Sequence, residues 1–343
     1  MRLLFVKLKH IGDSLLLTPT LAAVRATYPQ AEIWVVVREG CEGILSGCPA
    51  IDQIRTAAAP EAVKRSRWNW WHDFQTIREL RQRRFDYAFE LTDGDRGRWI
   101  AALGGAKVRC ANGAGRALNW WWRGQFNSVS QFEWQCRHRA EKDFFTVADA
   151  LPLKGEVPAM VFSRERTQDW PPAAAFPNYA VIHPGTRWRR KRWPKEKWIE
   201  LGRHLLGRLP ALIISAGPDT EERALASDLQ AALGPNVLNT AGRTSWAQLA
   251  GLLHRAGLFV GVDTAAMHLA AACQCPTVAI FGASNVAEWR PWKAPHRSVL
   301  PGGIVIAGSG PINGKSGAET KTQDVRVSDV VRGCEELLEG TQD

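Results

Sequence analysis

The sequence has few of the features that mark membrane-spanning, disulfide-stabilised or zinc-binding proteins. No apolar run reaches the roughly 20 residues that a bilayer crossing requires, and charge interrupts the first residues too soon for a secretion signal. The seven cysteines are odd in number, scattered and without CxxC spacing, which argues against a disulfide framework or a zinc site. We therefore predict a soluble, cytoplasmic protein.

The length of 343 residues exceeds what one ordinary core accommodates and predicts two α/β domains. With 45% hydrophobic and 23% charged residues, the composition is that of a globular protein. A proline-rich stretch of low periodicity marks the boundary. We predict an N-terminal domain over residues 1–160, a linker over 161–177, a second domain over 178–325 and a terminal helix over 326–343.

The net charge of +10 and the 16 tryptophans point to an anionic partner: a nucleic acid, a phospholipid surface or a phosphorylated substrate. Several tryptophans lie beside basic residues. Trp68, Trp70 and Trp71 fall in the basic, amphipathic segment 64–84, and Trp120 to Trp122 precede Arg123. Such clusters suit stacked bases, a membrane interface or an ordinary packed surface helix.

The first half begins with a strand, a loop, a helix and a second strand, at residues 2–8, 9–14, 15–27 and 33–37, which predicts a parallel crossover. The loop lacks GxGxxG, so we expect no dinucleotide site of the usual form there.

Gly12 and Asp13 follow the first strand at the sheet edge where α/β proteins bind ligands. Asp13 is either a general base or a helix N-cap. Asp93 follows the strand 85–91, where it either contacts an acceptor substrate or forms a turn.

The second half repeats one arrangement, in which a strand ends in a loop suited to a nucleotide. After the strand 179–182, the loop holds Thr186, and five of the six residues 187–192, Lys191 among them, are cationic. This loop either binds phosphate or is a solvated basic turn. After the strand 211–215 come Gly217 and Glu221. Glu221 either accepts ribose hydroxyls or stabilises the start of a helix.

The stretch 258–272 shows the arrangement most clearly, because a buried strand ends at Val262 and an alanine-rich helix follows. The first free N–H groups of this helix, at Thr264 to Met267 and thus including Ala265, would form an anion site. The alternative is that Asp263 or Thr264 only caps the helix. A further strand at 277–281 leads to the small-residue loop 282–285. Residues 301–324 are expected to form a loop, and 327–338 a helix.

These motifs together resemble the heptosyltransferases of lipopolysaccharide core assembly over nearly the whole chain. The resemblance is carried by Val6-Lys7, Gly12-Asp13, Leu16 to Pro19, Pro184 to Thr186, Lys191 to Pro194, Gly217 with Glu221, Gly261 to Thr264 with His268, and Phe281 to Ala283. Glu90 to Asp93 and Trp289 to Trp292 are most similar to the enzymes that add the third, branching heptose. The resemblance implies the GT-B fold: two Rossmann-like, doubly wound parallel-sheet domains that face a central cleft.

The resemblance also implies an activity, namely transfer of L-glycero-D-manno-heptose from ADP-heptose to a heptosylated Kdo-lipid A acceptor, with inversion. Asp13 would be the base, and Lys7, Gly12 and Asp93 would lie on the acceptor side. The donor would be bound by Thr186, Lys191, Glu221, Asp263, Thr264, Ala265 and His268. No metal or other cofactor is required, because the basic loop can offset the diphosphate charge, although Mg²⁺ at Asp263 is compatible with the motif.

A lipid-anchored acceptor implies a peripheral position on the inner face of the inner membrane, which fits the basic segment 64–84. Two alternatives remain at this point. One is a GT-B transferase that uses another nucleotide sugar. The other is a basic nucleic-acid-binding protein, although no common nucleic-acid module is present.

Overall fold

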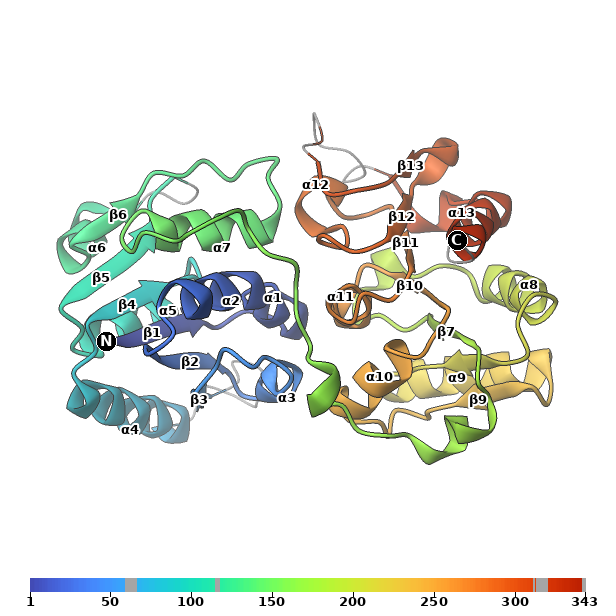
Figure 1. Ribbon diagram of the computed structural model, residues 1–343, viewed down its shortest axis with the longest axis horizontal. Helices are drawn as coiled ribbons and strands as arrows, with labels where there is room; N and C mark the ends of the chain where they lie inside the picture. The colour runs from blue at the N-terminus through green and yellow to red at the C-terminus, as the bar shows by residue number, and fades with distance from the viewer. Residues whose placement is uncertain (59–66, 115–117, 311, 313–319, 341–343) are drawn as a thin grey trace. The chain divides into compact units, whose positions relative to one another are not determined.

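The computed structural model describes residues 1–58, 67–114, 118–310, 312 and 320–340, and it divides the chain into two compact units (Figure 1). Unit 1 comprises Met1–Pro158 and unit 2 comprises Ala159–Asp343. Each unit contains one sheet with helices on both faces. Residues 64–66 of the predicted basic segment lie outside the described residues, as do the side chains of residues 67–70, among them Trp68 and Trp70.

Unit 1 is built on a parallel sheet of six strands in the order β3-β2-β1-β4-β5-β6. The strands are β1 (Arg2–Lys7), β2 (Glu32–Arg38), β3 (Gln53–Ala57), β4 (Tyr87–Glu90), β5 (Val108–Asn112) and β6 (Ser128–Ser130). The helices are α1 (Ile11–Leu15), α2 (Thr18–Thr27), α3 (Glu42–Leu45), α4 (Arg67–Arg83), α5 (Asp95–Leu103), α6 (Trp120–Gln125) and α7 (Arg139–Ala148). The strand order reverses between β1 and β4, and an open sheet of this kind binds ligands at such a point.

Alternate residues of β1 face opposite sides of this sheet, as the strand period of two requires. Leu4 and Val6 join the core cluster that includes Leu80 of α4 and Ile100 of α5. Lys7 lies on the other face, where its side chain contacts α7. The continuous apolar run of β1 therefore reflects burial on both faces, as is usual for a parallel strand.

The predicted helix over 15–27 is wrong in one respect, because the structure divides it into α1 and α2. Pro19 lies in the first turn of α2, where its missing N–H is tolerated, but it would break the interior of one longer helix. Helices α3, α5, α6 and α7 and strands β3, β5 and β6 were not predicted from the sequence. The helices have four to ten residues, and α5 to α7 carry charged side chains among their apolar ones, while the strands have only three to five residues.

Unit 2 has a seven-stranded sheet in the order β13-β12-β11-β10-β7-β8-β9, parallel except for β13. Its strands are β7 (Ala180–His183), β8 (Leu212–Ile214), β9 (Val237–Asn239), β10 (Leu258–Val262), β11 (Thr277–Ile280), β12 (His296–Val299) and β13 (Val305–Ile306). The helices are α8 (Lys195–Leu206), α9 (Thr220–Leu233), α10 (Trp246–Leu253), α11 (Ala265–Ala272), α12 (Val286–Trp289) and α13 (Val327–Glu339). Short 3₁₀ helices occupy Arg164–Arg166, Pro171–Ala175, Arg189–Lys191, Pro301–Gly303 and Thr322–Asp324. Here the strand order reverses between β7 and β10.

One face of the unit 2 sheet is covered by α8, α9 and α13, whose buried residues Trp198, Leu229 and Val330 share a core cluster with Ile182 and Val260. The predicted fold class, two doubly wound parallel-sheet domains, is confirmed. Among its predicted details, the loop over 301–324 is mostly irregular but contributes β13, and residues 311 and 313–319 of it lie outside the described residues.

Candidate active site

The reversal point of unit 2 brings together the loop after β7 and the start of α11. Lys191 ends a short 3₁₀ turn, and its Nζ lies 2.6 Å from Oδ2 of Asp263, which follows β10. Nζ also lies 3.4 Å from the backbone oxygen of Asp263. The side chains are 17% and 7% exposed, so the pair is sheltered but still reachable from solvent. The predicted phosphate-binding cation is thus fixed at the carboxyl edge of the sheet.

The N-terminus of α11 lies beside this ion pair. Thr264 is the N-cap residue, but its side chain makes no capping bond, and among the described residues nothing bonds to its buried Oγ1. The first-turn N–H groups, Ala265 included, therefore remain as donors for an anion. His268 lies one turn further, with Nε2 3.9 Å from Oδ1 of Asp263 and its ring 6.4 Å from that of Trp289. The arrangement suits a diphosphate.

Two further residues after β7 support the loop. Thr186 is buried, and its Oγ1 accepts a 3.3 Å bond from the N–H of Trp188, so this hydroxyl shapes the turn that delivers Lys191. His183, the last residue of β7, has Nδ1 2.8 Å from Oγ of Ser215. Burial lowers the pKa of His183 to about 4, so the ring is neutral at physiological pH.

The start of α9 contributes two neighbouring carboxylates that point in different directions. Glu221 is exposed and pairs with Arg192 at 2.6 Å and Arg189 at 3.5 Å. Glu222 turns inward, where Oε2 accepts a 2.9 Å bond from the N–H of Gly217. A Cβ at Gly185 would lie 2.5 Å from the same oxygen, so a larger residue there would displace the Glu222 carboxylate. Glu222, which the sequence analysis did not single out, therefore lies nearest the strand ends.

The loop over residues 282–285 is covered by another part of unit 2. A Cβ at Gly282 would lie only 2.2 Å from the backbone nitrogen of Thr322, and Thr320 Oγ1 donates to the Gly282 carbonyl at 2.8 Å. Residues 320–324 thus form one wall of this sheet edge.

In unit 1, Asp13 lies in the first turn of the five-residue helix α1, at the carboxyl edge of β1, and is half-buried. Gly12 precedes it in the same turn. Asp13 forms no N-cap, because His10 holds that position, so the capping alternative does not apply. Lys7, at the end of β1, is 4% exposed and donates from Nζ to both carboxylate oxygens of Asp143 on α7, at 2.9 and 2.7 Å. Burial lowers the pKa of Lys7, but Asp143 and Asp13 outweigh burial and raise it overall.

A second ion pair lies at the end of β4. Asp93 has φ of 58°, a left-handed conformation that aspartate tolerates, and its carboxylate pairs with Lys142 of α7. Burial raises the pKa of Asp93, but Lys142 outweighs it and keeps the pKa below its ordinary value.

Beside this pair, Glu90 is 1% exposed and accepts a 2.8 Å bond from the N–H of Thr92. Burial and the nearby Asp93 charge raise the pKa of Glu90 to about 7. Lys142, Asp143 and Glu90 were not predicted as site residues. For Lys142 and Asp143 the sequence offers no clear signal, because Arg139 and Glu141 also lie in the first turn of α7 and the four charged residues look alike.

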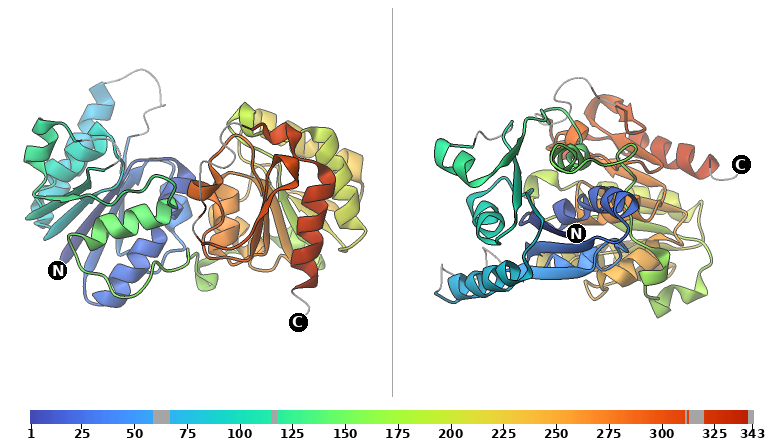
Figure 2. Two further views of the ribbon diagram at one scale, coloured as in Figure 1. Left: turned by 90° about the horizontal axis from the view of Figure 1, so that it is seen from above. Right: turned by 60° about the vertical axis from the view of Figure 1, so that its left-hand side comes forward.

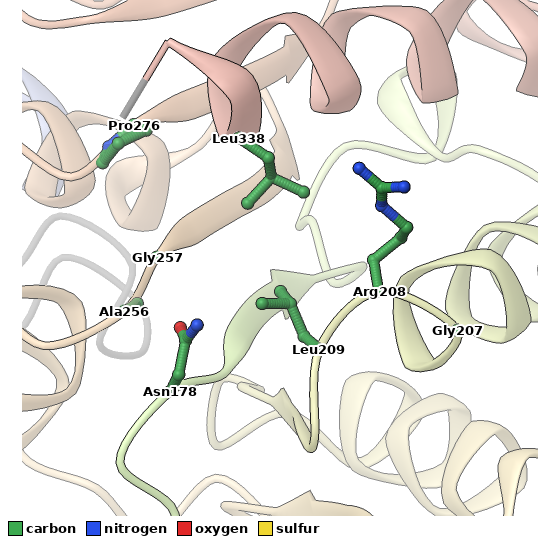
Figure 3. A pocket seen from close by; sticks show the side chains of 8 residues that line it. All are labelled: Asn178, Gly207, Arg208, Leu209, Ala256, Gly257, Pro276 and Leu338. Carbon is green, nitrogen blue, oxygen red and sulfur yellow. The ribbon is translucent and has the colours of Figure 1, made fainter. Parts of the chain in front are cut away.

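A separate hollow lies at the opposite, amino edge of the unit 2 sheet (Figure 3). It is lined by Asn178, Gly207, Arg208, Leu209, Ala256, Gly257, Pro276 and Leu338. Arg208 is paired with Glu335 at 2.8 Å, and none of the candidate residues lines this hollow. Within the described part of the chain there is also no group of three or more His, Cys, Asp or Glu that could hold a metal ion.

Two doubly wound units, one of which carries a phosphate-suited reversal point, have the architecture of the GT-B fold class. The comparisons with known proteins agree with this class. Residues 74–301 match glycosyltransferase family 9 (heptosyltransferase), and the chain belongs to that family. It is therefore a glycosyltransferase.

Individual relatives cover most of the chain. Lipopolysaccharide heptosyltransferase 3 of Escherichia coli is 29% identical over 82% of this chain and 84% of its own length. Lipopolysaccharide heptosyltransferase 1 of Pseudomonas aeruginosa is 30% identical over 83% of this chain and 79% of its own length. The structure of an E. coli heptosyltransferase with ADP-2-deoxy-2-fluoro heptose superposes with a TM-score of 0.79 at 19% identity, covering 98% of this chain and 99% of that one.

Proposed function

We propose that this chain transfers L-glycero-D-manno-heptose from ADP-heptose to a heptosylated Kdo-lipid A acceptor of the lipopolysaccharide inner core, in the manner of heptosyltransferase III. The observation that carries the proposal is the reversal point of unit 2, where Lys191 and Asp263 meet the uncapped start of α11. The name of the E. coli relative supports the acceptor class, and the ligand of the structural neighbour supports the donor class.

On the donor side, the chemistry requires stabilisation of the departing ADP. Lys191 and the N–H groups of Thr264 and Ala265 would bind its phosphates, because ammonium and helix-start donors both favour a growing negative charge. Asp263 would hold Lys191 and, with His268, border the sugar. The ribose would meet a carboxylate at the start of α9, where both Glu221 and the inward-facing Glu222 are candidates.

On the acceptor side, Asp13 would remove the proton of the attacking hydroxyl. A direct displacement with inversion needs one base and a stabilised leaving group, so no second catalytic carboxylate is required. Lys7 would orient Asp13 rather than touch the acceptor, because its ammonium is buried on Asp143. Gly12 and Asp93 would border the acceptor.

The proposal requires no metal, because Lys191 and the helix start supply positive charge at the phosphates. Turnover in EDTA equal to turnover in Mg²⁺ would support this part, and loss of turnover in EDTA would contradict it.

A lipid-anchored acceptor also implies a peripheral position on the inner face of the inner membrane. Among the described residues, none of the helices could span a bilayer.

The direct test mixes the protein with ADP-heptose and a heptosylated core acceptor and measures ADP release. Asp13→Ala should lower turnover by about 10²- to 10⁴-fold, the usual contribution of a general base, whereas Glu39→Gln, on an exposed loop after β2, should change nothing. A parallel panel with other nucleotide sugars tests the donor. Full turnover of the Asp13 variant would refute the mechanism, and turnover with another donor only would refute the substrate.

A further inference from the structure

One face of unit 1 carries exposed aromatic and aliphatic side chains among arginines. We call this the aromatic–arginine surface, and it consists of Trp71, Phe74, Arg78 and Arg81 on α4 with Trp99 and Leu103 on α5. The apolar members are between 40% and 57% exposed. Helices α4, α5 and α6 lie on the same side of the sheet (Figure 2, right).

The α4 members form a single stripe because they recur at intervals of three and four residues. The opposite side of the helix faces the protein, where Thr76 and Leu80 are buried. Trp71 and Phe74 stack on each other with ring centroids 5.7 Å apart, and more than half of each residue is still exposed. The stripe therefore presents its aromatic rings and its arginines to the surroundings together.

The stripe continues onto the neighbouring helix. Leu103 lines a hollow with Phe74, Ile77 and Arg81, and a Cβ at Gly105 would lie 3.1 Å from the Arg81 side chain. Trp99 lies one helical turn before Leu103, on the same side of α5.

Helix α6 adjoins this end of the surface. Trp99 contacts Trp121 of α6 at 5.0 Å between ring centroids. Its neighbour Trp120 is 85% exposed, and Arg123 is exposed as well. The apolar stripe is thus extended by α6 rather than ended by it.

The charge of this face is positive because its carboxylates are already neutralised. Asp73 pairs with Arg96 and Glu79 with Arg55, each at 2.7 Å. No described carboxylate pairs with Arg78 or Arg81 in the structure. The unbalanced charge on the surface is therefore that of its arginines.

We infer that the aromatic–arginine surface docks on an anionic lipid bilayer. Indole, phenyl and leucine side chains enter the boundary between headgroups and acyl chains, while arginines remain at the anionic headgroups. A nucleic acid fits less well, because Leu103 offers no ring on which a base can stack. The inference deepens the proposed function, on which it rests for the identity of the membrane; binding to lipid does not itself depend on catalysis.

The experiment measures sedimentation of the full chain with vesicles of phosphatidylcholine, with and without phosphatidylglycerol. Wild type should bind the anionic vesicles only. Phe74→Ser with Leu103→Ser should lower the partition coefficient about ten-fold through lost apolar burial, and Arg78→Gln with Arg81→Gln also about ten-fold. Control variants on unit 2, Trp188→Ser with Ile304→Ser and Arg203→Gln with Arg243→Gln, each alter two exposed residues, apolar in the first and arginine in the second, and should stay within about two-fold of wild type.

Vesicle binding that survives in both surface variants would overturn the inference. So would equal binding to neutral vesicles, or binding of a single-stranded oligonucleotide through these residues without vesicle binding. Thermal unfolding of each variant separates loss of docking from loss of fold. Transfer to a delipidated soluble acceptor should be unchanged in the surface variants, so an inactive wild type would refute the proposed function while leaving the vesicle result valid.

Discussion

The carboxyl edges of the two sheets occupy equivalent positions in equivalent folds, but they handle charge differently. In unit 1 the cations Lys7 and Lys142 are buried on Asp143 and Asp93, so the charges are compensated inside the protein. In unit 2, Lys191 and Asp263 form one partly open pair beside the start of α11, where the N-cap residue Thr264 makes no side-chain capping bond. The cations of the first edge are thus closed off from solvent, whereas the pair of the second edge is still reachable from it.

The difference fits the two roles proposed for these edges, proton removal in unit 1 and diphosphate binding in unit 2. A group that removes a proton must keep its position and protonation state without help from the ligand, which favours a preformed network. A site for a diphosphate must instead leave donors unpaired until the ligand arrives. This contrast predicts opposite sensitivities of the two edges to substitution.

The largest expected effect is on stability, from removal of one partner in each ion pair. Asp143→Asn leaves the Lys7 ammonium buried without a counter-charge and should cost about 3 to 5 kcal/mol. Asp263→Asn should cost only about 1.5 kcal/mol, because Lys191 can turn to solvent. Native-state hydrogen exchange of β1 and β10 amides reports each unit separately. Equal losses in the two units would contradict the comparison.

A second effect concerns the pH dependence of unit 1. The pKa of Glu90 is about 7 in the folded protein and 4.5 in its ordinary state, so the folded state retains the proton more tightly between these values. Stability should fall by about 3 kcal/mol as pH rises through this window and be level outside it. Glu90→Gln keeps the acceptor for the Thr92 N–H and should remove the slope. Denaturation of the wild type and of Glu90→Gln between pH 4.5 and 8 measures the pH dependence of stability, with Glu39→Gln as the control variant. A slope that persists in Glu90→Gln would mean that another group causes it.

These features differ in how far the sequence predicts them. Both sheets can be predicted from the buried apolar runs that end in glycine or polar loops. Asp13, Lys191 and Asp263 can be predicted as candidate site residues because they lie in the loops that follow strands. The Lys7–Asp143 pair could not be predicted, because its members are 136 residues apart and only the packing of α7 brings them together. The choice between Glu221 and Glu222 depends on helix phase, where one residue turns a side chain by about 100°.

A third effect is on nucleotide affinity. Lys191→Met removes a charge-assisted contact and should weaken ADP binding by about 10- to 100-fold. Lys9→Met, at the edge of unit 1, should leave the affinity unchanged, as should Lys195→Met, whose side chain pairs with Asp228 on the surface. Isothermal titration calorimetry with ADP measures all three. Equal weakening of ADP binding by Lys9→Met would contradict the proposal that the nucleotide binds at the edge of unit 2 and not at the edge of unit 1.

The smallest effect decides which carboxylate meets the ribose. Glu222 lies against Gly185 and Gly217 at the strand ends, whereas Glu221 is held outward by two arginines. Glu222→Gln should therefore weaken ADP binding by about five-fold, the value of one charge-assisted bond made neutral, and Glu221→Gln by less than about two-fold. Inorganic pyrophosphate, which lacks the ribose, serves as the control ligand and should bind both variants alike. The reverse order for ADP would assign the ribose to Glu221, because only a direct contact makes the exposed residue the more sensitive of the two.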